Sequence, residues 1–246
     1  MNVRDWNGRT MLANAASGAQ MEMLAYLLEK GADVNAADKN GMTALHWAAH
    51  NHDAAMVSVL TTAGAKPNSR ATIYKRGHSE SSVSAYMHFP YEGAPLHWAL
   101  GGKSVYKTAH RAGPAPDVLA TVKALLDAGA DPKLATEGGR KPLELPVTLR
   151  DRYVLRLLLE RGADPTEVRV ALLHIAVAND DCETVKLLIE KGCDINKTAS
   201  PASSWEPIDE LVGKRVTFAS GKSATPLQRA RSDRMRQLLR DAGAHE

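Results

Sequence analysis

Apolar residues recur along this chain at helical spacing in short segments, each of which is followed by a glycine. In one such segment Val185, Leu188 and Ile189 fall three and four residues apart, as on one face of a helix. The glycines can adopt the left-handed conformation that ends a helix, and they are Gly31, Gly64, Gly129, Gly162, Gly192 and Gly243. Threonine and proline stand near the start of the preceding segments, where they suit a helix N-cap and a first helical position. The pattern predicts pairs of short helices.

The pairs are copies of one sequence unit. Residues 5–12 (DWNGRTML) return as residues 38–45 (DKNGMTAL), an offset of 33 positions. Related starts follow at Ala94, Lys141, Ala171 and Thr225. A helix pair of this size cannot bury its apolar face alone, so neighbouring pairs must stack to form a core.

A period of 33 and the signature T-P-L-H-x-A, seen here as APLH at residues 94–97, resemble the ankyrin-repeat family. The resemblance covers most of the chain. It implies an all-α fold, an ankyrin-repeat solenoid of six helix-turn-helix units with an inserted β-hairpin finger. We expect one domain over residues 1–246, with units at about 5–37, 38–68, 90–133, 137–166, 167–197 and 221–246.

Three insertions interrupt the period, at about residues 69–93, 102–116 and 198–222. In the first, apolar and polar residues alternate between Val83 and Phe89, which predicts a β-hairpin. Insertions in a repeat array map to loops and often to the binding face. By the geometry of the family, the first and third insertions bracket a concave groove as a clamp for a folded partner.

Candidate partner-binding residues come from the finger tips, the end of a first helix and the three insertions. The resemblance places Trp6 and Met42 at finger tips, and His50 and Asn51 at variable surface positions at the end of a first helix. The remaining candidates are aromatic residues of the insertions, namely Tyr74, Tyr86, Phe89, Tyr91, Tyr106, Trp205 and Phe218. Exposed aromatic side chains are typical interface anchors. The alternative is that these aromatic rings only pack the insertions against the stack.

The sequence offers little catalytic chemistry. The resemblance gives His46, His97 and His174 a structural role at the signature position. His46 and His50 stand four residues apart, but no third metal ligand lies at a supporting spacing. The pair Asp180 and Asp181 is explained by a helix N-terminus. We therefore expect no catalytic residue, no metal and no cofactor.

Composition narrows the partner class. The 246 residues carry a net charge of only +3, which argues against a nucleic-acid or polybasic membrane binder. No uncharged run is long enough to span a membrane. Cys182 and Cys193 are too far apart along a helix for a disulfide, so we expect two thiols.

We therefore expect a non-catalytic protein-protein interaction module that is monomeric on its own. An inhibitor or immunity-type protein of bacterial type that neutralises a partner enzyme is the favoured role. The alternative is a localisation or regulatory domain of a larger enzyme, or a secreted effector. Because Met1 falls within the link between two units, we expect a missing upstream segment. The sequence as written fits the cytoplasm, and a removed signal would make the protein periplasmic or secreted.

Overall fold

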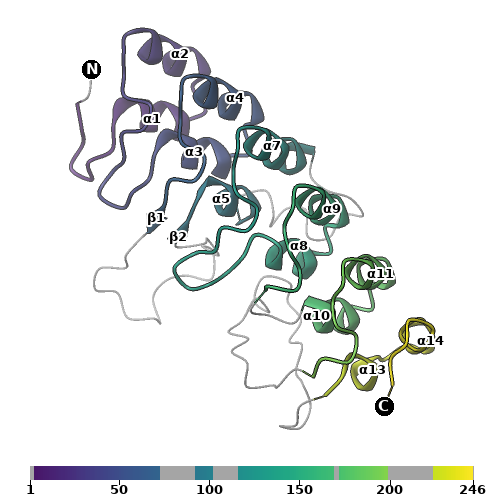
Figure 1. The fold of residues 1–246 in the computed structure, drawn as a ribbon. Coiled ribbons are helices and arrows are strands. Elements are labelled where there is room, and N and C mark those ends of the chain that lie inside the picture. Colours follow the sequence, from purple (N-terminus) through teal and green to yellow (C-terminus); the bar gives the residue numbers. More distant parts are fainter. Residues whose placement is uncertain (1–2, 73–91, 102–115, 169–171, 199–223, 246) are drawn as a thin grey trace. The chain divides into compact units, whose positions relative to one another are not determined.

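The structure is a computed structural model that describes residues 3–72, 92–101, 116–168, 172–198 and 224–245. The chain divides into two compact units, residues 1–142 and 143–246. Each unit is a double row of helices, which Figure 1 shows for the two units in turn.

In the first unit an inner row is formed by α1 (Met11–Ser17), α3 (Ala44–His50) and α5 (Pro95–Gly101). The outer row is formed by α2 (Met21–Glu29), α4 (Ala54–Thr62) and α7 (Pro116–Asp127). Helix α3 packs between α1 and α5, and α4 packs against α7. Leucine and alanine fill the space between the rows, with Leu12, Leu24 and Leu45 among the fully buried side chains.

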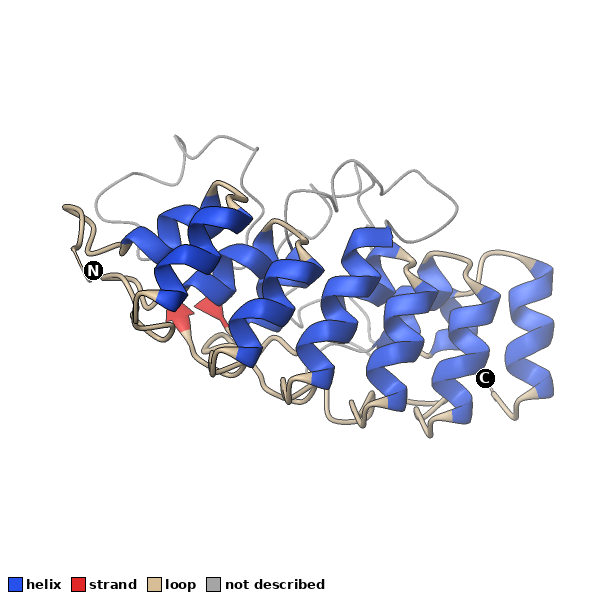
Figure 2. Ribbon diagram, turned by 90° about the horizontal axis from the view of Figure 1, so that it is seen from above, coloured by secondary structure: helices blue, strands red, loops and turns tan. Residues whose placement is uncertain are grey.

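In the second unit the inner row is formed by α8 (Glu144–Leu149), α10 (Leu172–Ala178) and α13 (Pro226–Arg229). The outer row is formed by α9 (Arg152–Glu160), α11 (Cys182–Glu190) and α14 (Asp233–Asp241). Helix α10 contacts both α8 and α13. Figure 2 shows the outer helices of each unit lying side by side.

The ends of the helices follow the expected signals. Thr10 accepts a hydrogen bond from the Ala13 amide, and Thr225 accepts one from the Gln228 amide. Each glycine expected after a second helix has a positive φ, between +78° and +94°. A second left-handed position, which the sequence analysis did not anticipate, lies in the turn inside several pairs, at Ala19, His52, Arg150 and Asp180.

Pro146 lies within the first helix of its pair, as the third residue of α8. Helix α8 has six residues, whereas α1, α3, α5 and α10 have seven each. Arg150 follows it with a φ of +59°. The first turn of a helix needs no intrahelical backbone donor, so α8 continues through this proline.

Only the base of the first insertion is described. Strands β1 (Ala71–Thr72) and β2 (Glu92–Gly93) pair antiparallel there. The alternating segment between Val83 and Phe89 lies outside the described residues, so the β-hairpin stays a prediction. Cys182 and Cys193 are both thiols, in agreement with the sequence analysis.

Candidate protein-binding surface

The first finger turn, residues 5–9, is held by its own hydrogen bonds. The Asp5 carboxylate accepts from the amides of Asn7 and Arg9, both at 2.9 Å. The Gly8 amide donates to the Asp5 carbonyl at 2.8 Å, and Gly8 has a φ of +78°. With these bonds in place the turn has one backbone shape, so its tip projects in a fixed direction.

Trp6 lies at the tip of this turn and is 82% exposed. Its carbonyl accepts a hydrogen bond from Lys39 Nζ at 2.7 Å, which ties the turn to the next finger. An exposed indole on a fixed backbone loses little conformational freedom when a partner covers it. The Trp6 side chain is therefore accessible to a partner, and its role in binding stays a prediction.

The second finger turn, residues 38–42, repeats this geometry and corrects one prediction. The Asp38 carboxylate accepts from the amides of Asn40 and Met42, at 2.8 and 3.0 Å. Met42 therefore corresponds to Arg9 and not to the tip, and its side chain is buried. The tip residue is Lys39, which the period of 33 already places opposite Trp6 and which the sequence analysis missed.

A third finger turn lies at residues 136–140. The Thr136 amide donates to the Arg140 carbonyl at 2.9 Å, and the Gly139 amide donates to the Thr136 carbonyl at 3.0 Å. Glu137, another residue that the sequence analysis missed, stands at the position of Trp6 and Lys39 and is exposed.

Neighbouring fingers of the first unit are joined in sequence order. The Lys39 amide donates to the Asn7 carbonyl at 3.1 Å, and the Thr72 amide donates to the Asn40 carbonyl at 2.8 Å. The Glu92 carboxylate then accepts from the Gly138 amide at 2.6 Å. We call Trp6, Lys39 and Glu137 the finger row, a set of exposed side chains with aromatic, basic and acidic character.

Beside the fingers, an aromatic cluster runs along the inner helices. The Arg9 guanidinium lies 4.2 Å from the ring centre of the half-buried Trp47, within the range of a cation–π contact. Trp47 meets His50 edge to face at 6.1 Å, and His50 meets Trp98 in the same way at 6.3 Å.

Two further predicted contact residues need correction. His50 is buried, because it packs between Trp47 and Trp98, so it does not offer a surface side chain. Asn51 is half-buried, and its amide nitrogen donates to the carbonyls of Ala16 and Ser17 at 3.0 and 3.1 Å. Its side chain therefore already serves to join α3 to α1.

The signature histidines hold the finger backbone. His46 Nδ1 accepts from the Thr43 amide at 3.2 Å, which leaves Nε2 to donate to the Gly93 carbonyl at 3.3 Å. His174 Nε2 donates to the Lys197 carbonyl at 2.8 Å. Burial lowers the pKa of His46, His97 and His174 to about 4, so all three are neutral at pH 7. This structural role of the three histidines is the one that the family resemblance implies.

The aromatic residues of the insertions cannot be placed on this surface. The seven residues Tyr74, Tyr86, Phe89, Tyr91, Tyr106, Trp205 and Phe218 lie outside the described residues. They stay predicted contacts, as does the clamp.

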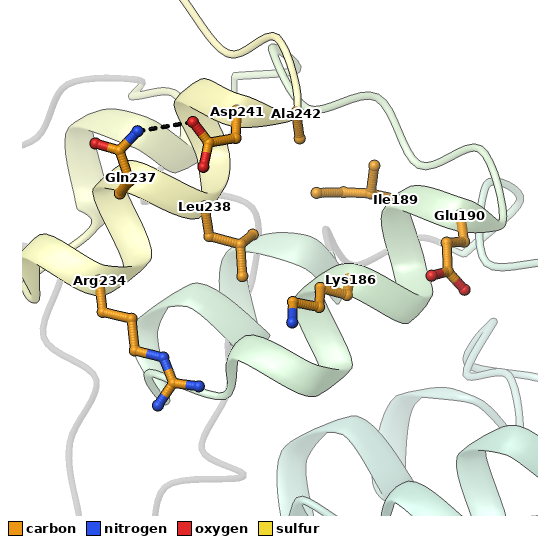
Figure 3. A pocket seen from close by; sticks show the side chains of 8 residues that line it. All are labelled: Lys186, Ile189, Glu190, Arg234, Gln237, Leu238, Asp241 and Ala242. Carbon is orange, nitrogen blue, oxygen red and sulfur yellow. Dashed lines mark hydrogen bonds between the residues drawn. The ribbon is translucent and has the colours of Figure 1, made fainter.

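The second unit carries an open groove of about 590 Å³ between α11 and α14. Ile189, Leu238 and Ala242 give it an apolar floor, and Figure 3 shows these side chains pointing toward one another. Lys186, in the middle of α11, and Arg234, in the first turn of α14, also line it. Among the described parts of the chain, no three His, Cys, Asp or Glu side chains gather as a metal site would need. No helix in those parts has the length and apolar character that a membrane crossing requires.

Comparisons with known proteins agree with the repeat. The bovine mitochondrial disaggregase is 34% identical over 152 residues, which cover 60% of this chain and 22% of that protein. Its human counterpart is 30% identical and is covered to 26%. The chain thus spans about a quarter of the length of these relatives. A putative ankyrin repeat protein of Rickettsia bellii is 36% identical over 64 residues, 25% of this chain and 35% of that protein.

The fold comparison and the family comparison agree. The crystal structure of the human ASB11 ankyrin repeat domain aligns with a TM-score of 0.63 and 21% identity, over 100% of this chain and 88% of that one. A family model for ankyrin repeats in three copies matches residues 1–71 and 120–199, well over half of the sequence. The chain therefore belongs to the ankyrin repeat family.

Proposed function

We propose that this chain is a non-catalytic module that binds another protein through its finger row and the neighbouring inner helices. Ankyrin repeats indicate a protein-protein interaction module in general. The observation that carries the specific proposal is Trp6, which is 82% exposed on a turn fixed by hydrogen bonds. Large aromatic anchors of this kind dominate the energy of many interfaces.

The charged residues of the finger row support a polar rim. Lys39 lies beside Trp6 and contacts its carbonyl, and Glu137 belongs to the same finger row. A partner that covers Trp6 would meet the basic Lys39 beside it, and a partner that extends along the finger row would also reach the acidic Glu137, as in interfaces with an apolar centre and a charged edge.

The finer proposals concern the array and the partner. The helix pairs are proposed to form six repeat units of a single domain, with the first insertion as a β-hairpin finger and the chain monomeric on its own. The partner is proposed to be an enzyme that this chain neutralises, in the manner of a bacterial inhibitor or immunity protein. That role is supported only by the family resemblance.

A second candidate function is a localisation or regulatory part of a larger protein. It is favoured by the share of the relatives that this chain spans, 22% and 26% of the two disaggregases. The full gene sequence separates the two candidates, because it shows whether a catalytic domain accompanies the repeats.

The binding proposal is tested by a Trp6→Ala variant. Partners are captured with the wild-type chain, and the affinity of the identified partner for each variant is measured by calorimetry. We expect Trp6→Ala to weaken binding by about 2 kcal/mol or more, roughly thirtyfold.

Tyr153→Ala is the matched control, because Tyr153 is also an exposed aromatic residue but lies on α9. It should bind as the wild type does, and both variants should keep the wild-type unfolding curve. Unchanged affinity of a folded Trp6→Ala variant would remove the finger row from the site.

A further inference from the structure

The groove between α11 and α14 has an alanine at its edge, where the preceding repeat has a lysine. Ile189, three residues before the glycine that follows α11, lies in the floor and is half-buried. Its counterpart on α9, Leu159, is only 6% exposed. The residue before the glycine of the next helix is Lys191 in that repeat and Ala242 beside the groove. A lysine stem covers apolar surface, and an alanine methyl is too short to do so.

The charged side chains of the groove change sign in the same order along both walls. On α11 the basic Lys186 comes one turn before the acidic Glu190. On α14 the basic Arg234 comes two turns before the acidic Asp241. Because α11 and α14 are equivalent helices of a repeat, they run in the same direction. The groove therefore leads from a basic to an acidic end, across the apolar floor that Figure 3 shows.

These charges oppose the dipoles of their own helices. Arg234 lies in the first turn of α14, whereas Glu190 and Asp241 are the last residues of their helices. Each is placed where the helix dipole disfavours its sign. Arg234 has no hydrogen-bond or ion-pair partner among the described residues, and the neighbouring Asp233 pairs with Arg236 at 3.0 Å. Residues that break a local rule in this way are expected at functional sites.

The corresponding place between α2 and α4 has the apolar residue but not the basic ones. Leu28 on α2 is half-buried, and Ala63 precedes the glycine after α4. The two basic residues of the groove are replaced there by Ala25 and Ala55. The charge order is thus specific to α11 and α14 and does not follow from the repeat.

We propose that this groove docks an amphipathic helix of a partner protein, with an acidic, a leucine-rich and a basic part along one face. Arg234 and Asp241 are seven residues apart, which is about 10 Å along a helix at about 1.5 Å per residue. A helix that runs in the same direction spans this length with glutamate at position i, leucine at i+3 and i+4, and lysine at i+7. These positions share one face of a helix.

Each part of the docking helix has a counterpart in the groove. The glutamate meets Arg234 and Lys186, the leucines cover Ile189 and Leu238, and the lysine meets the acidic end. The docking site lies on the outer helices of the second unit, so it is a different surface from the finger row.

The residues that follow α14 lead toward the fingers. The His245 amide donates to Asn196 Oδ1 at 3.1 Å, as the Lys66 amide donates to Asn35 Oδ1 at 2.8 Å in the first unit. In the first unit this course takes the chain from α4 to β1. This favours an occupant from another molecule over the adjoining segment of this chain.

The proposal is tested with a synthetic helix and the whole chain. The probe is an alanine-based peptide of about fifteen residues, stapled to keep it helical, with the glutamate, two leucines and lysine at the proposed spacing. We expect a Kd of about 0.1 mM or lower by fluorescence anisotropy. A peptide with glutamate and lysine exchanged should bind about tenfold more weakly. Arg234→Glu, at an exposed position, should weaken the original peptide by about tenfold.

Ala242→Lys tests the open floor, because it restores the long side chain that Lys191 supplies in the preceding repeat. It should weaken binding of the peptide by about tenfold or more. The matched control is Ala63→Lys, the equivalent and equally exposed position after α4, which should bind the peptide as the wild type does. A wild-type chain that does not bind the peptide, or equal affinities for all variants, would overturn the proposal.

Two further outcomes would identify another occupant and so overturn the proposal. The first is a dimer of the wild-type chain that Ala242→Lys abolishes, because a second copy would then fill the groove. The second is a urea midpoint that falls in Ala242→Lys but not in Ala63→Lys, because the lysine would then displace a segment of this chain. We expect monomers, and a midpoint no lower than that of the wild type for both variants.

Discussion

The first and the last helix pair are built from the same repeat, yet the residues on their outward sides differ in polarity. At the end of the chain, Arg236 replaces the apolar residue that the other outer helices bury, such as Leu24, Val57 and Val185. At the beginning, Met23 keeps the apolar type that Met56 and Met235 show, although it is exposed.

The difference shows that one residue of each outer helix decides how a stack can end. A charged side chain at the outward position stays in water and closes the core, as terminal repeats with a polar outer face do. An apolar side chain there leaves a surface that gains free energy when another helix covers it. The last helix pair thus presents a charged outward side, whereas the first presents an apolar one.

The largest effect is expected from truncating methionines at the equivalent position. Met56→Ala and Met235→Ala each remove a fully buried side chain and should lower the free energy of unfolding by about 2–5 kcal/mol. Met23→Ala should change it by less than about 0.5 kcal/mol, because Met23 is exposed. Urea unfolding followed by circular dichroism measures all three. Equal losses at Met23 and Met56 would contradict the comparison.

Acid should destabilise the second, third and fifth helix pairs more than the others. Only these three carry the signature histidine, whereas Ala13, Glu144 and Gln228 occupy that position in the first, fourth and last pairs. Burial lowers the pKa of His46 to about 4, below its unfolded value of 6.5. The unfolded chain therefore takes up the proton first. Stability is complete above pH 6.5 and falls as the pH drops from 6.5 toward 4.

The expected loss is about 2 kcal/mol per histidine at pH 5, read from urea unfolding at a series of pH values. His46→Gln is the matched variant, because Gln228 already accepts the Thr225 amide at this position of the last pair, at 3.0 Å. It should keep the cap and flatten the pH dependence. An unchanged pH profile for this variant would exclude His46 as the titrating group.

The smallest effect on stability, and the most direct test of the closed end, comes from Arg236→Leu. The variant loses one exposed ion pair and should keep its free energy of unfolding within about 1 kcal/mol. It gives the last pair an apolar outward side, so sedimentation should reveal head-to-tail association with the exposed Met11 and Met23 of another copy. Monomers at every concentration would argue that Arg236 does not close the array.

Much of the fold follows from local signals in the sequence. The threonine caps and the glycines after the outer helices were each predicted from one or two residues. They depend on the backbone preferences of those residues, so no knowledge of the neighbours is needed. The position of Trp6 at a finger tip came from the family resemblance.

The site was predicted less well, because burial depends on what packs against a residue. Met42 was assigned to a tip, although its alignment with Arg9 was already available in the sequence. His50 ends its helix like a surface residue, but Trp47 and Trp98 enclose it. Arg9 was missed as a partner of Trp47, since the two are far apart in sequence and come together only by stacking.

The sequence by itself determined the repeat, the helix pairs and their ends, because these rest on periodicity and on local backbone chemistry. Only the tertiary structure decided which of several equivalent apolar residues remain exposed. Met23 and Met56 have the same side chain at the same repeat position, and the neighbouring helix pair alone distinguishes them.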